Sequence, residues 1–392
     1  MTTTVTNGLM DAVQQIEPVL RENSALADAE RTLPKAAMDA MVEAGIFRTW
    51  VPRAFGGMEM APTPAIQMFE EISRIDSAAG WIASNSCVIS TFCQVLPDAG
   101  AAEIFADPNN IVAGGWFPPG PAVPAADGYR VSGQWTFGSG CQHAPWLTTM
   151  GLITDNGKPR VGPDGQPVQI LIFFPAAEAE IVDTWHTLGM RGTGSHDIKL
   201  TDVFIPERRT FIMGPFDHPG SAYRGPLYAF HLWLAGPPIA SVALGIARAA
   251  LDDFIALAGR KTPSYTQVGL SDRAIIQDRV ARAKAMLDAA RVYLYRALDD
   301  AWAYLSTGAN ITHAQGIPVQ LASCHAIETA GKVVDLVHAA VGTTGIRNEH
   351  RFQQYFRDVH TVSQHAFGSP TRFESVGKLL LGKESDWEFF YL

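Results

Sequence analysis

Long apolar runs and cysteines are both scarce in this chain of 392 residues. No stretch approaches the roughly 18 apolar residues of a membrane-spanning helix, and residues 1–8 lack the basic and apolar parts of a secretory signal. The four cysteines have neither CxxC spacing nor the density of a disulfide scaffold; they are Cys87, Cys93, Cys141 and Cys324. We therefore expect a cytoplasmic protein with reduced thiols and no membrane partner.

Clusters of basic residues, metal-binding motifs and a dinucleotide fingerprint are also missing. The formal net charge is -9, and a clustered basic surface is what nucleic-acid phosphates require, so nucleic acid is excluded as a partner. The eleven histidines show no HExxH-like spacing, and we expect no metal site. Without a Gly-x-Gly-x-x-Gly motif, the chain has no recognisable site for a nicotinamide dinucleotide.

The chain does contain a hydrophobic pattern whose period changes twice. With 47% hydrophobic and 18% charged residues, it is typical of a soluble globular protein of two or three folding units. Apolar residues recur at helical spacing up to about residue 105, at strand spacing from 111 to 216, and at helical spacing again from 225. We expect strands at 111–116, 129–137, 147–154, 168–175 and 199–206. The pattern predicts an α+β fold with a helical domain at 1–110, a β domain at 111–220 and a helical bundle at 221–392.

Two long apolar stripes dominate the last third of the chain. They span residues 244–258 and 280–305 at steps of three and four residues, which favours a four-helix bundle. Such stripes form cores more often than sites, so we assign them no chemistry. Their breadth predicts that bundles of several subunits pack together.

The most informative stretch is residues 132–146, which begins as a strand and ends as a loop. Trp135 and Phe137 are strand formers, whereas Gly138 and Gly140 interrupt regular pairing and let the backbone approach a flat ligand. Ser139 lies between the two glycines, and we expect its hydroxyl to be unobstructed. The alternative is a hairpin corner with a tryptophan on the sheet face. A second glycine-rich loop, residues 188–197, lacks the Gly-Lys-Ser/Thr of a phosphate-binding loop and precedes a strand.

Several short motifs occur in a characteristic order along the chain. They are the glycine motifs at 44–46, 55–57, 133–140, 189–193, 245–251 and 342–346, the Asp-Val-Phe-Ile-Pro of 202–206, and Arg357-Asp358. In this order and spacing the chain resembles the acyl-CoA dehydrogenase superfamily over essentially its whole length. The resemblance implies an N-terminal helical domain, a central β-barrel or sandwich domain and a C-terminal four-helix bundle, with a flavin between the β domain and the bundle.

The expected catalytic base of a dehydrogenase is missing. Such an enzyme needs a carboxylate to remove a proton while hydride moves to the flavin, yet residues 357–370 and 228–251 contain no glutamate. His365 stands close to the position of the base. The chain thus resembles the reduced-flavin-dependent, two-component monooxygenases of the same fold, whose Trp-x-Phe-x-Ser-Gly motif matches Trp135, Phe137, Ser139 and Gly140.

This second resemblance implies the oxygenase component of a two-component flavin-dependent monooxygenase. The enzyme would use reduced FMN, or FADH2, and O2 through a C4a-hydroperoxyflavin to oxygenate a planar aromatic substrate of the phenol or indole type. A separate NAD(P)H flavin reductase would supply the reduced flavin, and a homotetramer is implied. FMN is favoured because Ala339 replaces the superfamily's adenosine-contacting glutamine. Two alternatives stay open: an acyl-CoA dehydrogenase or oxidase, and a non-catalytic helical binding protein.

The same resemblance implies the roles of individual residues. His365 would remove a proton from the substrate or support the flavin peroxide, because imidazole titrates near working pH, and Ser139 would hydrogen bond near the reactive part of the flavin. The expected cofactor contacts are Trp135, Phe137, Ser139, Thr193, Ser195 and, supplied across a subunit boundary, Arg260. The expected substrate pocket comprises Trp81, Asn85, Trp116, Phe230 and His231.

For two of these residues, a purely structural role is the alternative. His365 would otherwise be a buried histidine that caps a backbone carbonyl, and Arg260 a solvated arginine at a helix end. His360 is a second candidate for the catalytic histidine, with a structural role favoured. Some relatives carry a histidine shortly after the Gly-Trp of the N-terminal unit. Here Trp81 is followed by Ser84, Asn85 and Ser86, so we expect no substrate contact equivalent to the one that this histidine makes.

Overall fold

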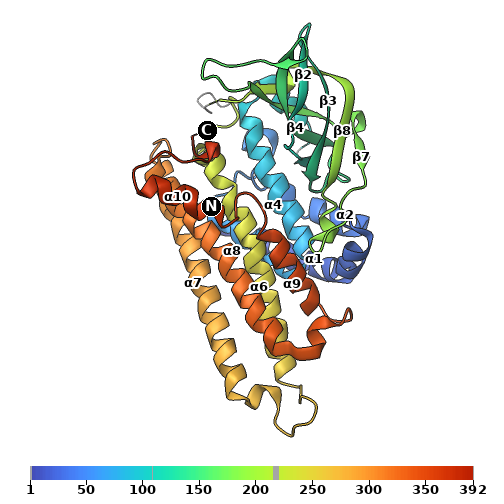
Figure 1. Cartoon of the computed structure of the whole chain (residues 1–392), viewed down its shortest axis with the longest axis vertical. Coiled ribbons are helices and arrows are strands. Elements are labelled where there is room, and N and C mark those ends of the chain that lie inside the picture. Colours follow the sequence, from blue (N-terminus) through green and yellow to red (C-terminus); the bar gives the residue numbers. More distant parts are fainter. Residues whose placement is uncertain (1, 108, 215–219, 392) are drawn as a thin grey trace.

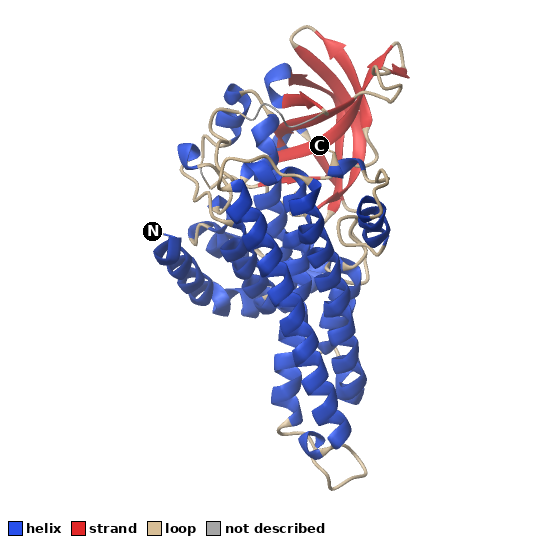
Figure 2. Cartoon of the chain, turned by 90° about the vertical axis from the view of Figure 1, so that its left-hand side faces the viewer, coloured by secondary structure: helices blue, strands red, loops and turns tan. Residues whose placement is uncertain are grey.

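The computed structural model describes residues 2–107, 109–214 and 220–391. Helices precede and follow a single β-sheet, which lies at one end of the molecule, while the C-terminal helices extend away from it (Figures 1 and 2). The N-terminal helices are α1 (Thr2–Glu30), α2 (Lys35–Glu43), α3 (Pro62–Ile75), α4 (Ser77–Phe92) and α5 (Asp98–Ile104). The predicted order of helical, β and helical segments is confirmed.

Helix α4 is the element that the other parts surround. All its residues except Asn85 are buried, as expected for a helix of small and apolar residues that has no charged side chain. Its N-cap Asp76 accepts a hydrogen bond from the Ala79 backbone N–H at 2.7 Å and another from the Ser24 hydroxyl at 2.6 Å, which satisfies the helix start and joins it to α1. The helix contacts α3, α6 and β1, so its side chains reach both the sheet and the bundle.

The β segment forms one curved, mixed sheet. Its strands are β1 (Val112–Gly114), β2 (Gly120–Ala125), β3 (Gly128–Gly138), β4 (Trp146–Asp155), β5 (Lys158–Pro159), β6 (Gln169–Pro175), β7 (Glu180–Val182), β8 (His196–Pro206) and β9 (Thr210–Ile212). The order is β7-β8-β3-β2-β4-β6-β9, with β1 and β5 also paired to β4. The five predicted strands are present, but the short β2, β5, β7 and β9 were missed because each is too short or too rich in Pro and Gly to show an apolar period.

A β-bulge interrupts the pairing of β3 with β8. The register shifts between Trp135, opposite Ile198, and Gly138, opposite His196, and Phe137 adopts a positive φ of 66°. A bulge of this kind turns a side chain away from the face that simple alternation predicts. Trp135 therefore points into the core, where it is fully buried, whereas Phe137 is 66% exposed.

The C-terminal helices form the predicted four-helix bundle. It consists of α6 (Gly236–Ala258), α7 (Ala274–Leu305), α8 (His313–Val341) and α9 (Phe352–Val362), followed by α10 (Thr371–Leu380). The apolar stripes of α6 and α7 are buried apart from Val280, which is partly exposed. A short 3-10 segment, Tyr228–Leu234, leads into α6, and another, Glu388–Phe390, lies near the C-terminus. No helix of the described residues is long and apolar enough to cross a membrane.

Helix α3 joins the N-terminal helices to the bundle at a close approach to α6. A Cβ atom on Gly245 would lie 2.4 Å from the backbone oxygen of Glu70, so only glycine permits this contact. The fully buried carboxylate of Glu70 receives Arg248 Nη1 at 2.7 Å and Arg291 Nε at 2.9 Å. One continuous hydrophobic cluster spans all three segments, and the exact domain boundaries stay a prediction.

Candidate functional site

The two glycine-rich loops singled out in the sequence lie against each other. The backbone N–H of Gly140 donates to the carbonyl of Thr193 at 2.9 Å. The hydroxyl oxygens of Ser139 and Ser195 are 2.7 Å apart, and those of Ser195 and Thr193 are also 2.7 Å apart. The structure thus brings three of the expected cofactor contacts into one row of hydroxyl groups.

Trp81 connects this row to the expected catalytic histidine. Its indole Nε1–H donates to Ser139 Oγ at 2.9 Å, and its ring meets the ring of His365 edge to face with centroids 5.4 Å apart. The prediction of an unobstructed Ser139 hydroxyl was wrong, because α4 and the 188–197 loop both place polar groups against it. Ser139, Trp81 and His365, far apart in the sequence, meet at one place.

His365 lies on the turn that follows α9, where its side chain is partly buried. Burial lowers its pKa from 6.5 to about 4, because desolvation disfavours the charged imidazolium. The backbone N–H of Phe367 lies 3.4 Å from His365 Nδ1, so this nitrogen accepts, and the alternative role as a cap of a backbone carbonyl is not seen among the described contacts. In the neutral ring the proton is then on Nε2.

Phe137 and Trp135 have different surroundings. The exposed ring of Phe137 meets Trp185 edge to face at 6.1 Å, next to the hydroxyl row. The indole N–H of Trp135 donates to the carbonyl of Met150 at 2.7 Å inside the sheet. Trp135 is a core residue whose side chain is fully buried, so the expected contact with the cofactor was wrong.

A row of aromatic rings extends from His365 toward the sheet. Phe367 stacks on His365 at 6.0 Å, Phe389 lies 5.6 Å from Phe367, and Trp116 lies 6.4 Å from Phe389. Phe92, on the same face of α4 as Trp81 but three turns later, is 5.3 Å from Trp116. Trp116 therefore lies in the same row as His365, and its contact with the substrate stays a prediction. Phe367 and Phe389 were missed. Phe367 could have been predicted from its position two residues after His365. Phe389 could not, because only the tertiary fold brings it to the row.

The other expected pocket residues differ in their exposure and surroundings. Asn85 is partly exposed and donates to the Trp81 carbonyl, one turn earlier on α4, at 3.0 Å. Phe230 is fully buried, which makes it a core residue. His231 is partly exposed and has φ 49° and ψ -137°, an uncommon conformation in the segment before α6, and such outliers cluster at functional sites.

Two residues of the Arg-Asp motif tie α9 to the second glycine loop. Asp358 accepts from the Met190 backbone N–H at 2.6 Å and from the Ser77 hydroxyl at 2.5 Å, and burial raises its pKa to about 6. Arg357 donates to the carbonyl of Leu188 at 2.6 Å. His360 instead bonds Asp335 at 2.9 Å near the surface, in keeping with a structural role.

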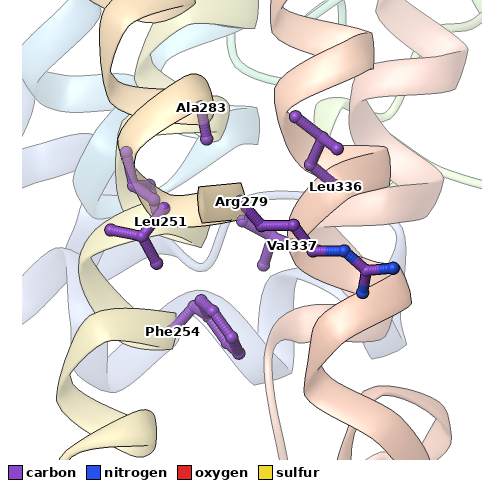
Figure 3. Close-up of a pocket in the computed structure, with 7 residues that line it drawn as sticks. Leu251, Phe254, Arg279, Ala283, Leu336 and Val337 are labelled. Carbon is purple, nitrogen blue, oxygen red and sulfur yellow. The ribbon is translucent and has the colours of Figure 1, made fainter. Parts of the chain in front are cut away.

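Arg260 is not brought to this site. It is exposed and follows the end of α6, which lies at the end of the bundle remote from the sheet (Figure 1). A shallow groove of about 150 Å³ lies between α6, α7 and α8, as Figure 3 shows. Its lining is apolar except for Arg279, whose Nη1 donates to the Ala339 carbonyl at 3.2 Å. This groove has no group suited to acid or base catalysis.

The geometry around Ser139 suits a flavin. A flavin is a flat ring system with an edge of nitrogen and oxygen atoms, and the structure offers an exposed aromatic ring, Phe137, beside the row of hydroxyls of Ser139, Ser195 and Thr193. Flat ligands pack on aromatic side chains and are oriented by a few polar groups. Ser139, Ser195 and Phe137 would hold such a group.

Comparison with known proteins gives a consistent result. The acyl-CoA dehydrogenase family matches in two parts, its N-terminal domain at residues 10–103 and its C-terminal domain at 238–370. The indole-3-acetate monooxygenase of Pseudomonas putida is 33% identical over 91% of this chain and 89% of its own length. The FADH(2)-dependent resorcinol hydroxylase, oxygenase component, of a Rhizobium species is 26% identical over 97% of this chain and 96% of its own.

The solved structures include a protein of the same fold with a bound flavin. XiaF from a Streptomyces species, in complex with FADH2 and glycerol, superposes with a TM-score of 0.89 at 24% identity, over 98% of both chains. The chain therefore belongs to the family of flavin-dependent monooxygenases built on the acyl-CoA dehydrogenase fold.

Proposed function

We propose that this chain oxygenates a planar aromatic substrate of the phenol or indole type, with Ser139 at the flavin and His365 at the substrate. The observation that carries the proposal is the position of Trp81, whose N–H donates to Ser139 at 2.9 Å and whose ring lies 5.4 Å from that of His365. One side chain thus joins the expected flavin side of the site to the expected substrate side.

The residues of the site have different roles. Reduced flavin, when bound, activates O2 so that one oxygen atom reaches the substrate. Ser139, Ser195 and Phe137 orient the flavin ring. His365, neutral at pH 7 because of its low pKa, carries its proton on Nε2 and donates a hydrogen bond to a polar atom of the substrate or of the oxygen being transferred. Of the two roles expected for His365, the Phe367 N–H at Nδ1 supports this donor role over proton removal.

The row of aromatic rings supports a flat, apolar substrate. Phe92, Trp116, Phe389, Phe367 and His365 contact one another in this order, and Trp81 meets His365. Aromatic rings that enclose a ligand also exclude water, which keeps activated oxygen for the substrate. The relatives named for indole-3-acetate and resorcinol support an indole or a phenol.

The absence of a free carboxylate at the site argues against a dehydrogenase. Among the described residues, no carboxylate forms a hydrogen bond with Trp81, Ser139 or His365. Asp358 is near in the sequence, but Ser77 and the Met190 N–H occupy both of its oxygens. An acyl-CoA would therefore find no base at the position it requires.

Partners and assembly follow from the same proposal. A relative named as an oxygenase component supports a separate NAD(P)H flavin reductase, and Ala339 in place of an adenosine-contacting glutamine supports FMN. Exposed apolar residues on α7, among them Ile275, Val292 and Tyr293, support a homotetramer, in which Arg260 of one subunit would reach a flavin bound to another. Four free, buried cysteines support a cytoplasmic location.

The decisive experiment measures oxygenated product and hydrogen peroxide together. The protein is supplied with NADH, FMN and a flavin reductase, and indole, indole-3-acetate and simple phenols are tested as substrates. His365→Ala should retain binding of reduced FMN but divert most of the O2 to hydrogen peroxide. His360→Ala is the matched control on α9 and should stay coupled. Efficient hydroxylation by His365→Ala would remove its assigned role, and reduction of bound flavin by an acyl-CoA would refute the proposal as a whole.

A further inference from the structure

The hydroxyl row at the site continues beyond Thr193 to a backbone carbonyl. Thr193 Oγ1 lies 2.8 Å from the carbonyl oxygen of Met190, and the row runs from there through Ser195 and Ser139 to Trp81 Nε1 with oxygen separations of 2.7 Å. The groups at its two ends have fixed roles, since a carbonyl only accepts and an indole N–H only donates.

These two ends determine the direction of every hydrogen bond between them. Each hydroxyl has a single proton, and Thr193 must give its proton to the Met190 carbonyl. Ser195 must therefore donate to Thr193, and Ser139 must donate to Ser195. Ser139 accepts the Trp81 N–H, and it has one lone pair left and no proton to offer.

The anchored end of the chain is held rigidly. Met190 has a positive φ of 54°, and its backbone N–H is bound by the buried carboxylate of Asp358 at 2.6 Å. Its carbonyl also accepts the Trp185 Nε1–H at 3.0 Å. The carbonyl that sets the direction of the chain is thus fixed from α9 and from the 183–188 segment.

We propose that Thr193 is a positioning residue that makes Ser139 a hydrogen-bond acceptor and thereby selects reduced over oxidised flavin. The inference rests on the proposed function, which assigns the flavin to Ser139. The central ring of reduced flavin carries an N–H where oxidised flavin has only a lone pair. A Ser139 that offers a lone pair attracts the first and repels the second. Such selectivity suits a chain that receives flavin already reduced and returns it oxidised.

Thr193→Val tests the inference because it removes one hydroxyl at nearly constant volume. The Met190 carbonyl keeps its bond from Trp185, so no buried acceptor is left unpaired. Ser195 loses its acceptor, the chain becomes free to reverse, and Ser139 can then donate. Thr193→Ser retains the hydroxyl and should behave as wild type. Thr149→Val is the matched control, since Thr149 is a fully buried threonine in β4.

The measurement is the dissociation constant of FMN in both redox states. Oxidised FMN is titrated in air and reduced FMN under anaerobic conditions, with fluorescence or equilibrium dialysis as the readout. Thr193→Val should lower the ratio of the oxidised to the reduced dissociation constant about tenfold, which corresponds to about 1.4 kcal/mol. Thr193→Ser and Thr149→Val should leave the ratio within about twofold of wild type.

Other results would overturn the inference, either alone or together with the proposed function. If Thr193→Val binds reduced FMN with an unchanged ratio, or Thr193→Ser lowers the ratio equally, the inference is overturned and the proposed function stands. If the wild-type protein binds neither redox form of FMN or of FAD, the proposed function and the inference are both overturned. Should Thr193→Val not fold, Thr193→Ala removes the same hydroxyl and must produce the same fall in the ratio.

Discussion

Replacing His365 by glutamine should remove an acid-sensitive contribution to stability. Burial lowers the pKa of His365 from 6.5 to about 4, whereas the unfolded chain takes up the proton near pH 6.5. A depressed pKa means that this contribution is complete above pH 6.5 and is lost as the pH falls toward 4. The difference between these two pKa values corresponds to about 3 kcal/mol.

The change in unfolding free energy over an experimentally accessible pH range follows from the folded and unfolded pKa values of His365. Between pH 7.5 and pH 5, wild type should lose about 2 kcal/mol of unfolding free energy that His365→Gln does not lose. The desolvated imidazole is the physical cause, because burial is the sole influence on this pKa.

Urea unfolding of the flavin-free proteins, at fixed protein concentration and in half-unit pH steps, measures this difference. The side chain of His350 is exposed, so His350→Gln serves as the control and should follow wild type throughout. A difference between wild type and His365→Gln that does not change with pH, or that grows in favour of wild type toward pH 5, would refute the reasoning.

Three further changes probe the fold and the site. Asp358→Asn should gain about 2 kcal/mol relative to wild type as the pH rises from 4 to 7 in urea titrations, because the raised pKa of about 6 makes the charged carboxylate costly at neutral pH; a pH-independent difference would contradict this. Glu70→Ala should cost about 3 kcal/mol at unchanged m-value, since it leaves Arg248 and Arg291 without their buried partner; a loss below about 1 kcal/mol would show that the cluster is dispensable. Phe389→Ala should raise KM for a single-ring phenol several-fold more than for a three-ring substrate, with Tyr391→Ala, on the same segment, as the control; equal changes for both substrates would show that Phe389 does not border the substrate.

Local patterns were enough for the architecture and for much of the site. The two changes of period predicted the order of helices, sheet and bundle, because the side-chain periods of helix and strand depend on the backbone alone. The motif around Ser139 and the histidine in place of a glutamate predicted the family, which the comparisons confirm. The resemblance also predicted that Ser139 and Ser195, on two separate glycine loops, both contact the flavin; the structure places their hydroxyl oxygens 2.7 Å apart, and the flavin contact stays a prediction.

The direction of individual side chains depended on tertiary structure. Strict alternation along a strand places Trp135 and Phe137 on one face, and both were expected at the flavin. The bulge between Trp135 and Gly138 sends one ring into the core and the other outward, and a bulge arises from pairing with β8, which is remote in the sequence.

What the sequence by itself determined, then, was the kind of elements, their order and the residue types available for chemistry. What only the tertiary structure decided was which of these residues meet. Trp81 reaches Ser139 across 58 positions of sequence, Asp358 reaches Met190 across 168, and Phe389 joins the aromatic row from the end of the chain. The physical reason is that such contacts arise when α4, the sheet and the bundle pack around one core. The sequence around each residue does not indicate which distant residue it will contact.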